Sequence, residues 1–410
     1  MEQSIVNRRA PGAIFPVIHF GSVSFIARAA LRASMPPVPE EVFLLPGPVK
    51  MDPRVLQAMA RPAMNHRGPE FKEILSEIRT LTQYLFGTRR EVAVLTGSGT
   101  AGLEAAVAGL LHKEDRVLNL VNGKFSERFH ELCQVFASAT ALPFEWGTAV
   151  APEKVAAALD ESGFRAVTLC WNETSTGLTN PIADIAKIVK AHDALFIVDG
   201  ITAVGGLENR MDAWGVDALV VGSQKCLAAP PGLSAVALSQ RAYDSLHSQS
   251  SFYNDLKAHV DAFAKQDTPF TPAVPLFLAL REALRILKEE GLEKRIARTA
   301  RLAEAARAAV RTLGLELFPD PNFASNTVSA IKYPAGLDDS SFRRILRETH
   351  RTTVAGGQGP LKGKIFRIGH MGICSFDDLT NGFRAIEAAL AAMGHRFKRG
   401  ASVEAIAAHS

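Results

Sequence analysis

The sequence predicts an α/β protein in which a large domain with a seven-stranded, mostly parallel sheet precedes a smaller C-terminal α+β domain. Between residues 91 and 238, short apolar runs rich in β-branched residues alternate with helical segments, the pattern of a parallel sheet covered by helices. After Pro275 the pattern changes to long helices with charged faces. A chain of 410 residues is long enough for both domains.

Seven apolar runs are expected as strands: residues 92–96, 117–121, 139–144, 166–171, 195–199, 218–222 and 234–238. The helices expected between them are residues 101–111, 125–136, 152–162 and 182–191. Pro152 and Pro181 lie near two of the helix starts, where a missing N–H costs little.

The C-terminal part should start with one long helix over residues 276–313, which Gly291 breaks or kinks. The elements expected after it are a strand at 327–332, a helix at 340–350, a turn at Gly356-Gly357, a strand at 365–368 and a helix at 376–393. Ser375 and Asp378 form a capping signature for that last helix. The predicted divisions are an N-terminal extension (1–40), the large domain (41–275), the long helix with the small domain (276–400) and a tail (401–410).

Residues 1–40 differ from the rest, because residues 1–39 carry four arginines and a single glutamate, +3 of the chain's net charge of +4. Such a segment is compatible with a transit peptide, with a disordered extension, or with a true start at Met35. The remainder is nearly neutral, which argues against nucleic acid or an anionic membrane as a partner.

The four cysteines are far apart and lack metal-ligand spacing, so we expect reduced thiols in a cytoplasmic protein without a bound metal. No apolar run reaches the roughly 18 residues of a membrane span.

Two polar residues close predicted buried strands: Asp199 after residues 195–198, and Lys225 shortly after 218–222. Polar groups at such strand ends lie where α/β sheets bind ligands. An amine and a carboxylate are the two groups that pyridoxal phosphate requires, one for a Schiff base and one for its ring nitrogen. The alternatives are a turn-capping Asp199 and a solvated Lys225, although the flanks of Lys225 are apolar.

The turn Gly97-Ser98-Gly99-Thr100-Ala101 follows the first strand and opens a helix. Its N–H groups and hydroxyls suit a phosphate at the positive end of the helix dipole. An ordinary strand-to-helix turn explains the pattern as well, but its place in the same sheet as Asp199 and Lys225 favours phosphate binding.

Three motifs together resemble the class V aminotransferases, within the fold type I pyridoxal phosphate enzymes: Gly97–Ala101, Val-Asp-Gly-Ile-Thr-Ala at 198–203, and Gly-Ser-Gln-Lys-Cys-Leu at 222–227. More narrowly, the chain is similar to the alanine-glyoxylate and serine-pyruvate aminotransferases. The likeness extends from Leu44 to the strand of Arg367.

The resemblance implies a role for each matching residue. Lys225 matches the Schiff-base lysine, Asp199 the partner of the pyridine nitrogen, and Ser98, Gly99 and Thr100 the phosphate cradle. The other matches are Phe125 as the aromatic that stacks on the ring, Ser175 and Gln224 as polar ring neighbours, and Thr271 as a phosphate contact from the partner subunit of a homodimer. By spacing alone, Phe125 is equally well a core residue on a helix face.

Arg367 and Gly47 match substrate-binding positions of the family. A guanidinium suits a substrate carboxylate because its fork donates two parallel bonds, although a structural ion pair is the other interpretation of Arg367. The segment with His66 and Arg67 resembles a family segment at the mouth of the site. Substrate gating is one interpretation of this segment, and a solvated loop is the other.

The implied activity is ping-pong transfer of an amino group from a small amino acid, such as alanine or serine, to a 2-oxo acid such as glyoxylate or pyruvate. The alternatives are a lyase or desulfurase of the same fold, a transaminase for aspartate, pyridoxamine or an aminophosphonate, and a non-catalytic regulatory protein. A desulfurase needs a reactive cysteine ahead of Arg367, and residues 314–366 contain none.

Overall fold

The computed structural model describes residues 41–161, 163–248 and 251–410. Residues 41–410 form one compact unit. The predictions for residues 1–40 and for Ser162 lie outside the described residues.

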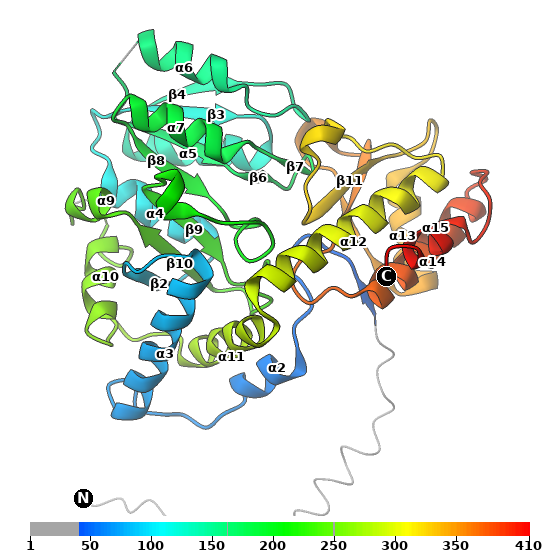
Figure 1. Ribbon diagram of the computed structural model, residues 1–410. Coiled ribbons are helices and arrows are strands. Elements are labelled where there is room, and N and C mark those ends of the chain that lie inside the picture. Colours follow the sequence, from blue (N-terminus) through cyan, green and yellow to red (C-terminus); the bar gives the residue numbers. More distant parts are fainter. Residues whose placement is uncertain (1–40, 162, 249–250) are drawn as a thin grey trace, which may run out of the picture. The chain divides into compact units, whose positions relative to one another are not determined.

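A seven-stranded sheet forms the centre of the fold, and all seven predicted strands belong to it. In spatial order they are β2 (Val92–Thr96), β10 (Leu233–Leu238), β9 (Ala218–Gly222), β8 (Leu195–Asp199), β5 (Ala166–Cys170), β3 (Arg116–Val121) and β4 (Ser138–Pro143) (Figure 1). β10 is antiparallel to both neighbours, whereas the pairs from β9 to β4 are parallel. The mostly parallel sheet is therefore confirmed.

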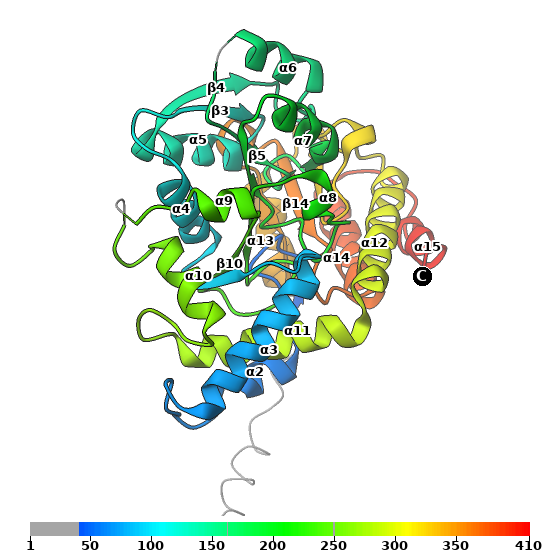
Figure 2. The ribbon, with the colours of Figure 1, turned by 60° about the vertical axis from the view of Figure 1, so that its left-hand side comes forward.

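Helices cover both faces of this sheet, because its strands are apolar on both sides. One face packs against α4 (Gly99–Leu110), α5 (Lys124–Phe136) and α10 (Leu256–Ala264). The other packs against α3 (Pro69–Phe86), α6 (Pro152–Glu161), α7 (Ile182–Ala191) and α11 (Val274–Glu290). Three short helices complete this part: α2 (Pro53–Met59), α8 (Met211–Trp214) and α9 (Gln240–Asp244). Figure 2 shows α3 beside α11, against which it packs.

Gly291 breaks the predicted long helix into α11 and α12 (Leu292–Thr312), because its φ of 86° ends the α-helical path. The buried Arg295 of α12 pairs with Glu290 at 2.6 Å across this break. α12 then leads to the C-terminal part of the chain (Figure 1).

A three-stranded antiparallel sheet forms the C-terminal part, in the order β11 (Val328–Lys332), β14 (Ile365–Gly369) and β13 (Ala355–Gly356). It shares an apolar core with α12, α13 (Asp339–His350), α14 (Phe376–Ala392) and α15 (Ala401–Ala407). The predicted cap is confirmed, since Ser375 accepts from the N–H of Asp378 at 3.1 Å and Asp378 accepts from the N–H of Ser375 at 3.0 Å.

The structure also contains elements that the sequence did not predict. β1 (Val42–Phe43) pairs with β12 (Thr352–Thr353), so the start of the predicted large domain lies on the C-terminal part. Gly356 is not in a turn as predicted but in β13, because its backbone pairs with β14. The predicted tail contains α15, whose Ile406 is fully buried. Within the described part of the chain, no helix has the length and apolar character needed to span a bilayer.

Candidate active site

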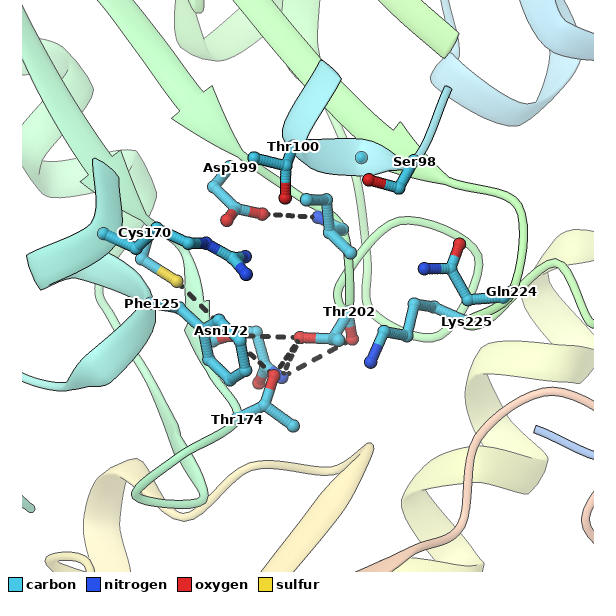
Figure 3. Close-up of a pocket in the computed structure, with 13 residues that line it drawn as sticks. Ser98, Thr100, Phe125, Cys170, Asn172, Thr174, Asp199, Thr202, Gln224 and Lys225 are labelled. Carbon is cyan, nitrogen blue, oxygen red and sulfur yellow. Dashed lines mark hydrogen bonds between the residues drawn. The ribbon is translucent and has the colours of Figure 1, made fainter. Parts of the chain in front are cut away.

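A cavity of about 180 Å³ lies at the carboxyl ends of the central strands, where an α/β sheet binds its ligands. Figure 3 shows side chains from several elements around it. Seven of the predicted site residues line this cavity: Ser98, Gly99, Thr100, Phe125, Asp199, Gln224 and Lys225. The other lining residues are Arg128, Cys170, Asn172, Thr174, Ile201 and Thr202.

Lys225 follows β9 and is partly buried at the cavity wall. Its Nζ donates to the carbonyl oxygen of Pro46 at 2.8 Å. Burial lowers the pKa of Lys225 to about 8. Nucleophilic and general-base chemistry both need a neutral amine, and the lowered pKa raises the neutral fraction near pH 7.

Asp199 ends β8 and is buried at the cavity wall. Its Oδ1 accepts the N–H of Ile201 at 2.9 Å, while no described residue donates to Oδ2. Burial raises the pKa of Asp199 to about 6, against the opposing effect of that N–H. The carboxylate thus has one oxygen available for a cationic ligand atom.

The start of α4 forms the third wall of the cavity. Ser98 is the N-cap, but its side chain makes no capping hydrogen bond, so its hydroxyl and the first N–H groups of the helix remain available for an anion. A Cβ at Gly99 would lie 2.4 Å from Ile201 Cδ1, so a larger residue here would require Ile201 to shift. The buried Oε1 of Gln224 has no hydrogen-bond partner among the described residues. The start of α4 fits a phosphate. The unpaired Gln224 oxygen fits a ring that carries a hydrogen-bond donor, such as a protonated nitrogen or a hydroxyl.

Phe125 and Arg128, one turn apart on α5, line another side of the cavity. The Arg128 guanidinium lies 4.9 Å from the centre of the Phe125 ring. Arg128 was not predicted as a site residue, because an arginine on an amphipathic helix is usually solvated. Its spacing of three residues from Phe125 on the same helix face was the available signal.

A hairpin of β6 (Asn172–Glu173) and β7 (Leu178–Thr179) supplies further polar residues that were not predicted from the sequence as a group. Asn172 Nδ2 donates to Thr202 Oγ1 at 2.8 Å, and the hydroxyls of Thr174 and Thr202 lie 2.9 Å apart. Figure 3 shows these three side chains at the cavity. The hydrogen bonds fix the hydroxyls at the cavity wall.

Arg367 lies on β14, next to the hairpin. Nε and Nη2 donate to the Gly356 carbonyl at 3.0 and 2.9 Å, and Nη1 donates to the Thr174 carbonyl at 3.0 Å. Burial lowers the pKa of Arg367 to about 10, with Glu173 opposing the shift. Three of its five N–H groups are bound, which leaves two for a carboxylate.

Besides Arg367 and Gly47, two predicted site residues do not line the cavity. Ser175 is fully buried behind it, where its hydroxyl donates to Glu173 at 2.6 Å and accepts the N–H of Lys124 at 2.9 Å. Thr271 is exposed to solvent and is not among the lining residues. Contact of either residue with a cofactor therefore stays a prediction.

Gly47 lies against the amine of Lys225, and a Cβ there would approach Nζ to 2.2 Å. Arg67 forms an ion pair with Asp267 and donates to the Thr268 carbonyl at 2.6 Å. The loop with His66 is thus joined to the segment that precedes Thr271, and its gating role remains a prediction.

The chain is similar in sequence to known aminotransferases. The chain is 41% identical over 365 residues to an uncharacterised aminotransferase of Methanocaldococcus jannaschii, covering 88% of this chain and 95% of that protein. It is 34% identical over 381 residues to a serine–glyoxylate aminotransferase of Methylorubrum extorquens, covering 89% and 94%.

Among solved structures, the ureidoglycine–glyoxylate aminotransferase of Bacillus subtilis matches with a TM-score of 0.88 and 32% identity, over 90% of this chain and 98% of that one. The fold is therefore that of the fold type I aminotransferases. The family model for aminotransferase class V matches residues 52–362. With this match over most of its length, the chain belongs to the class V aminotransferases.

Proposed function

We propose that this aminotransferase moves an amino group from a small amino acid, such as alanine or serine, to a 2-oxo acid such as glyoxylate or pyruvate. The observation that carries the proposal is the single cavity lined by Lys225, Asp199 and the start of α4. Two relatives named for glyoxylate support the choice of acceptor.

Pyridoxal 5'-phosphate is the cofactor that these groups fit. Lys225 would hold it covalently and Asp199 would bind its ring nitrogen. Ser98, Gly99 and Thr100 would receive its phosphate, and Gln224 would be a polar neighbour of the ring. Phe125 would cover one face of the ring. When bound, the cofactor would supply an electron sink for the pair that stays on the substrate Cα after a base removes the proton.

The chain's own residues account for the remaining steps. Arg367 binds the substrate carboxylate through its two remaining N–H groups, which orients the substrate in the cavity. When its amine is not bonded to the cofactor, Lys225 would take the substrate Cα proton on Nζ and later return a proton. Asp199 keeps its negative charge against the ring nitrogen. Because the same site serves both half-reactions, we expect ping-pong kinetics.

A panel of amino donors in single turnover, each followed by glyoxylate, pyruvate or 2-oxoglutarate, tests the proposal through the absorbance of the bound cofactor. Lys225→Ala should abolish both the absorbance of the lysine-bound cofactor and all turnover. The exposed Lys187, which pairs with Asp184, provides the control Lys187→Ala with wild-type behaviour. A wild-type protein that holds the cofactor and shows no half-reaction with any donor contradicts the proposal.

A desulfurase reaction is the second candidate, since enzymes of that kind share the fold. It requires a thiolate nucleophile at the site. Burial raises the pKa of Cys374 and of Cys226 to about 12, and that of Cys170 well above its ordinary value. These thiols stay protonated at neutral pH, which favours transamination.

A homodimer with shared sites is also part of the proposal. Near the exposed Thr271, three aromatic rings form a cluster on the surface, and Phe252 is 84% exposed. The rings of Phe252 and Tyr253 each lie 5.3 Å from that of Phe270. Exposed aromatic clusters are typical of protein interfaces. A second copy that covers this cluster would bring its Thr271 toward a neighbouring cavity.

We further propose a cytoplasmic location, supported by four cysteines that are all free thiols.

A further inference from the structure

The first turn of α5, which carries Phe125, obtains its caps from another segment of the chain. Its N-cap residue, Gly123, has no side chain to offer. The N–H of Lys124 donates to Ser175 Oγ at 2.9 Å, that of Phe125 to Glu173 Oε1 at 3.2 Å, and that of Ser126 to Glu173 Oε2 at 2.8 Å. The N–H groups that the helix itself leaves unpaired are thus bound by the β6–β7 hairpin.

Glu173 has an environment suited only to a carboxylate. It is fully buried, and no described cation forms a salt bridge with it. Besides the two N–H groups of α5, its oxygens accept from the N–H and hydroxyl of Ser175 at 3.2 and 2.6 Å, and Ser126 Oγ lies 3.0 Å away. The positive end of the α5 dipole adds to this stabilisation. A neutral glutamine would direct an NH₂ group at some of these donors.

Gly123 permits the approach of this carboxylate to the helix. A Cβ at residue 123 would lie 2.3 Å from Glu173 Cγ and 2.5 Å from Cδ. Any larger residue at the N-cap would therefore displace Glu173 from the helix terminus.

Glu173 connects two parts of the candidate site. Glu173 accepts a hydrogen bond from the N–H of Phe125, and Phe125 lines the cavity. On its other side, the adjacent Thr174 places its side chain in the cavity and its carbonyl on Arg367 Nη1 at 3.0 Å. Glu173 is also the nearby negative charge that opposes the lowering of the pKa of Arg367 by burial.

We propose that Glu173 is a positioning residue of this aminotransferase, which holds Phe125 against the ring of the cofactor and Thr174 against Arg367. The proposal rests on the proposed function, because Phe125 is assigned there to the ring. Glu173 itself does not line the cavity, so it acts through these two residues.

The test compares Glu173→Gln with Glu127→Gln. Glu127 lies in the first turn of the same helix and pairs with Lys124 at the partly exposed surface, so its variant also removes one acid near the helix start. Three quantities are measured for each protein: amide hydrogen exchange of residues 123–127 without cofactor, the Kd for pyridoxal phosphate, and the visible circular dichroism of the bound cofactor.

In Glu173→Gln we expect faster exchange at residues 124–126, a Kd raised about tenfold, equivalent to about 1.4 kcal/mol, and a reduced dichroic signal from the folded protein. Glu127→Gln should match the wild type in all three. A purely structural role would lower the unfolding temperature and leave the Kd and dichroism of the folded protein unchanged. Wild-type Kd and dichroism in Glu173→Gln, or equal losses in both variants, would overturn the proposal.

If Glu173→Gln does not fold, Ser175→Ala decides by the same criteria, because it removes the acceptor of the Lys124 N–H and one donor to Glu173. A wild-type protein that does not bind pyridoxal phosphate contradicts the proposed function instead. The exchange measurement, which needs no cofactor, still decides whether Glu173 holds the first turn of α5.

Discussion

Lys225 and Gly47 are in direct contact, although they are 178 residues apart in the sequence: a Cβ on Gly47 would lie 2.2 Å from Lys225 Nζ. The amine also donates to the carbonyl of the preceding residue, Pro46, at 2.8 Å. The amine at the centre of the proposed chemistry is therefore held by a segment from the start of the described chain.

Gly47→Ala should displace the Lys225 amine and lower kcat/KM about 100-fold, because small displacements of a reacting group have large effects on rate. Borohydride trapping of the cofactor followed by peptide mass spectrometry measures the loss at Lys225. Gly336→Ala is the control, since Gly336 also has a positive φ (80°) but a Cβ there meets nothing within 4 Å. Wild-type trapping in Gly47→Ala would refute the importance of this contact.

The pH dependence of stability should reveal the buried amine of Lys225. Its folded pKa of about 8 is lower than the roughly 10.4 of an unfolded lysine. Between these values the unfolded state binds more protons, so the free energy of unfolding of the cofactor-free protein should rise with pH from about 8 to 10. Urea unfolding of wild type and Lys225→Met checks this, because the methionine variant lacks that part of the rise. An identical rise in both proteins would contradict the prediction.

Asp199 should change the pH dependence of the free energy of unfolding at acid pH. Burial raises its folded pKa to about 6, above the roughly 3.9 of an unfolded aspartate, so the folded state binds more protons between these values. The contribution of Asp199 to stability is complete below about pH 4 and is lost as the pH rises through 6. The unfolding free energy of the wild type, relative to that of Asp199→Asn, should therefore fall as the pH rises over that range. A difference that is constant with pH would show that Asp199 titrates normally.

Arg367→Lys should raise KM for the amino donor by about 10- to 100-fold, with a smaller effect on kcat. The fork of Arg367 is held by the carbonyls of Gly356 and Thr174, and a lysine cannot keep these bonds while donating two more. Steady-state kinetics with a fixed acceptor measure the effect, with the exposed Arg384→Lys as control. An unchanged KM would remove Arg367 from the substrate site.

Phe252→Ser should weaken the proposed dimer at least about tenfold, because exposed aromatic residues often dominate the energy of interfaces. Sedimentation velocity over a concentration series measures the dissociation constant. Val135 on α5 is 64% exposed and outside the aromatic cluster, so Val135→Ser is the matched control. Equal dissociation constants for wild type and Phe252→Ser would show that the cluster is not part of the interface.

The sequence predicted the seven strands and several cavity residues for a local reason. Asp199 and Lys225 follow continuous buried strands, and parallel strands direct their carboxyl ends to one edge of a sheet. Gly97 to Ala101 was recognisable for the same reason, because it joins a strand to a helix.

Glu173 and Arg128 show what the sequence pattern did not predict. An acid in a polar turn and an arginine on an amphipathic helix both resemble solvent-exposed residues. Their positions depend on the packing of α5 against the β6–β7 hairpin, two segments about 50 residues apart. The same limit applies to Ser175, whose hydroxyl binds Glu173 behind the cavity.

By itself, the sequence determined the strand and helix pattern, the positions of Asp199 and Lys225 at strand ends, and the resemblance to class V aminotransferases, because these depend on short motifs and apolar periodicity. Only the tertiary structure decided that Gly47 touches Lys225, that β1 pairs with β12, and that Glu173 caps α5. Such contacts join segments distant in the chain, and they arise from packing and from the need to satisfy buried polar groups, which no local pattern records.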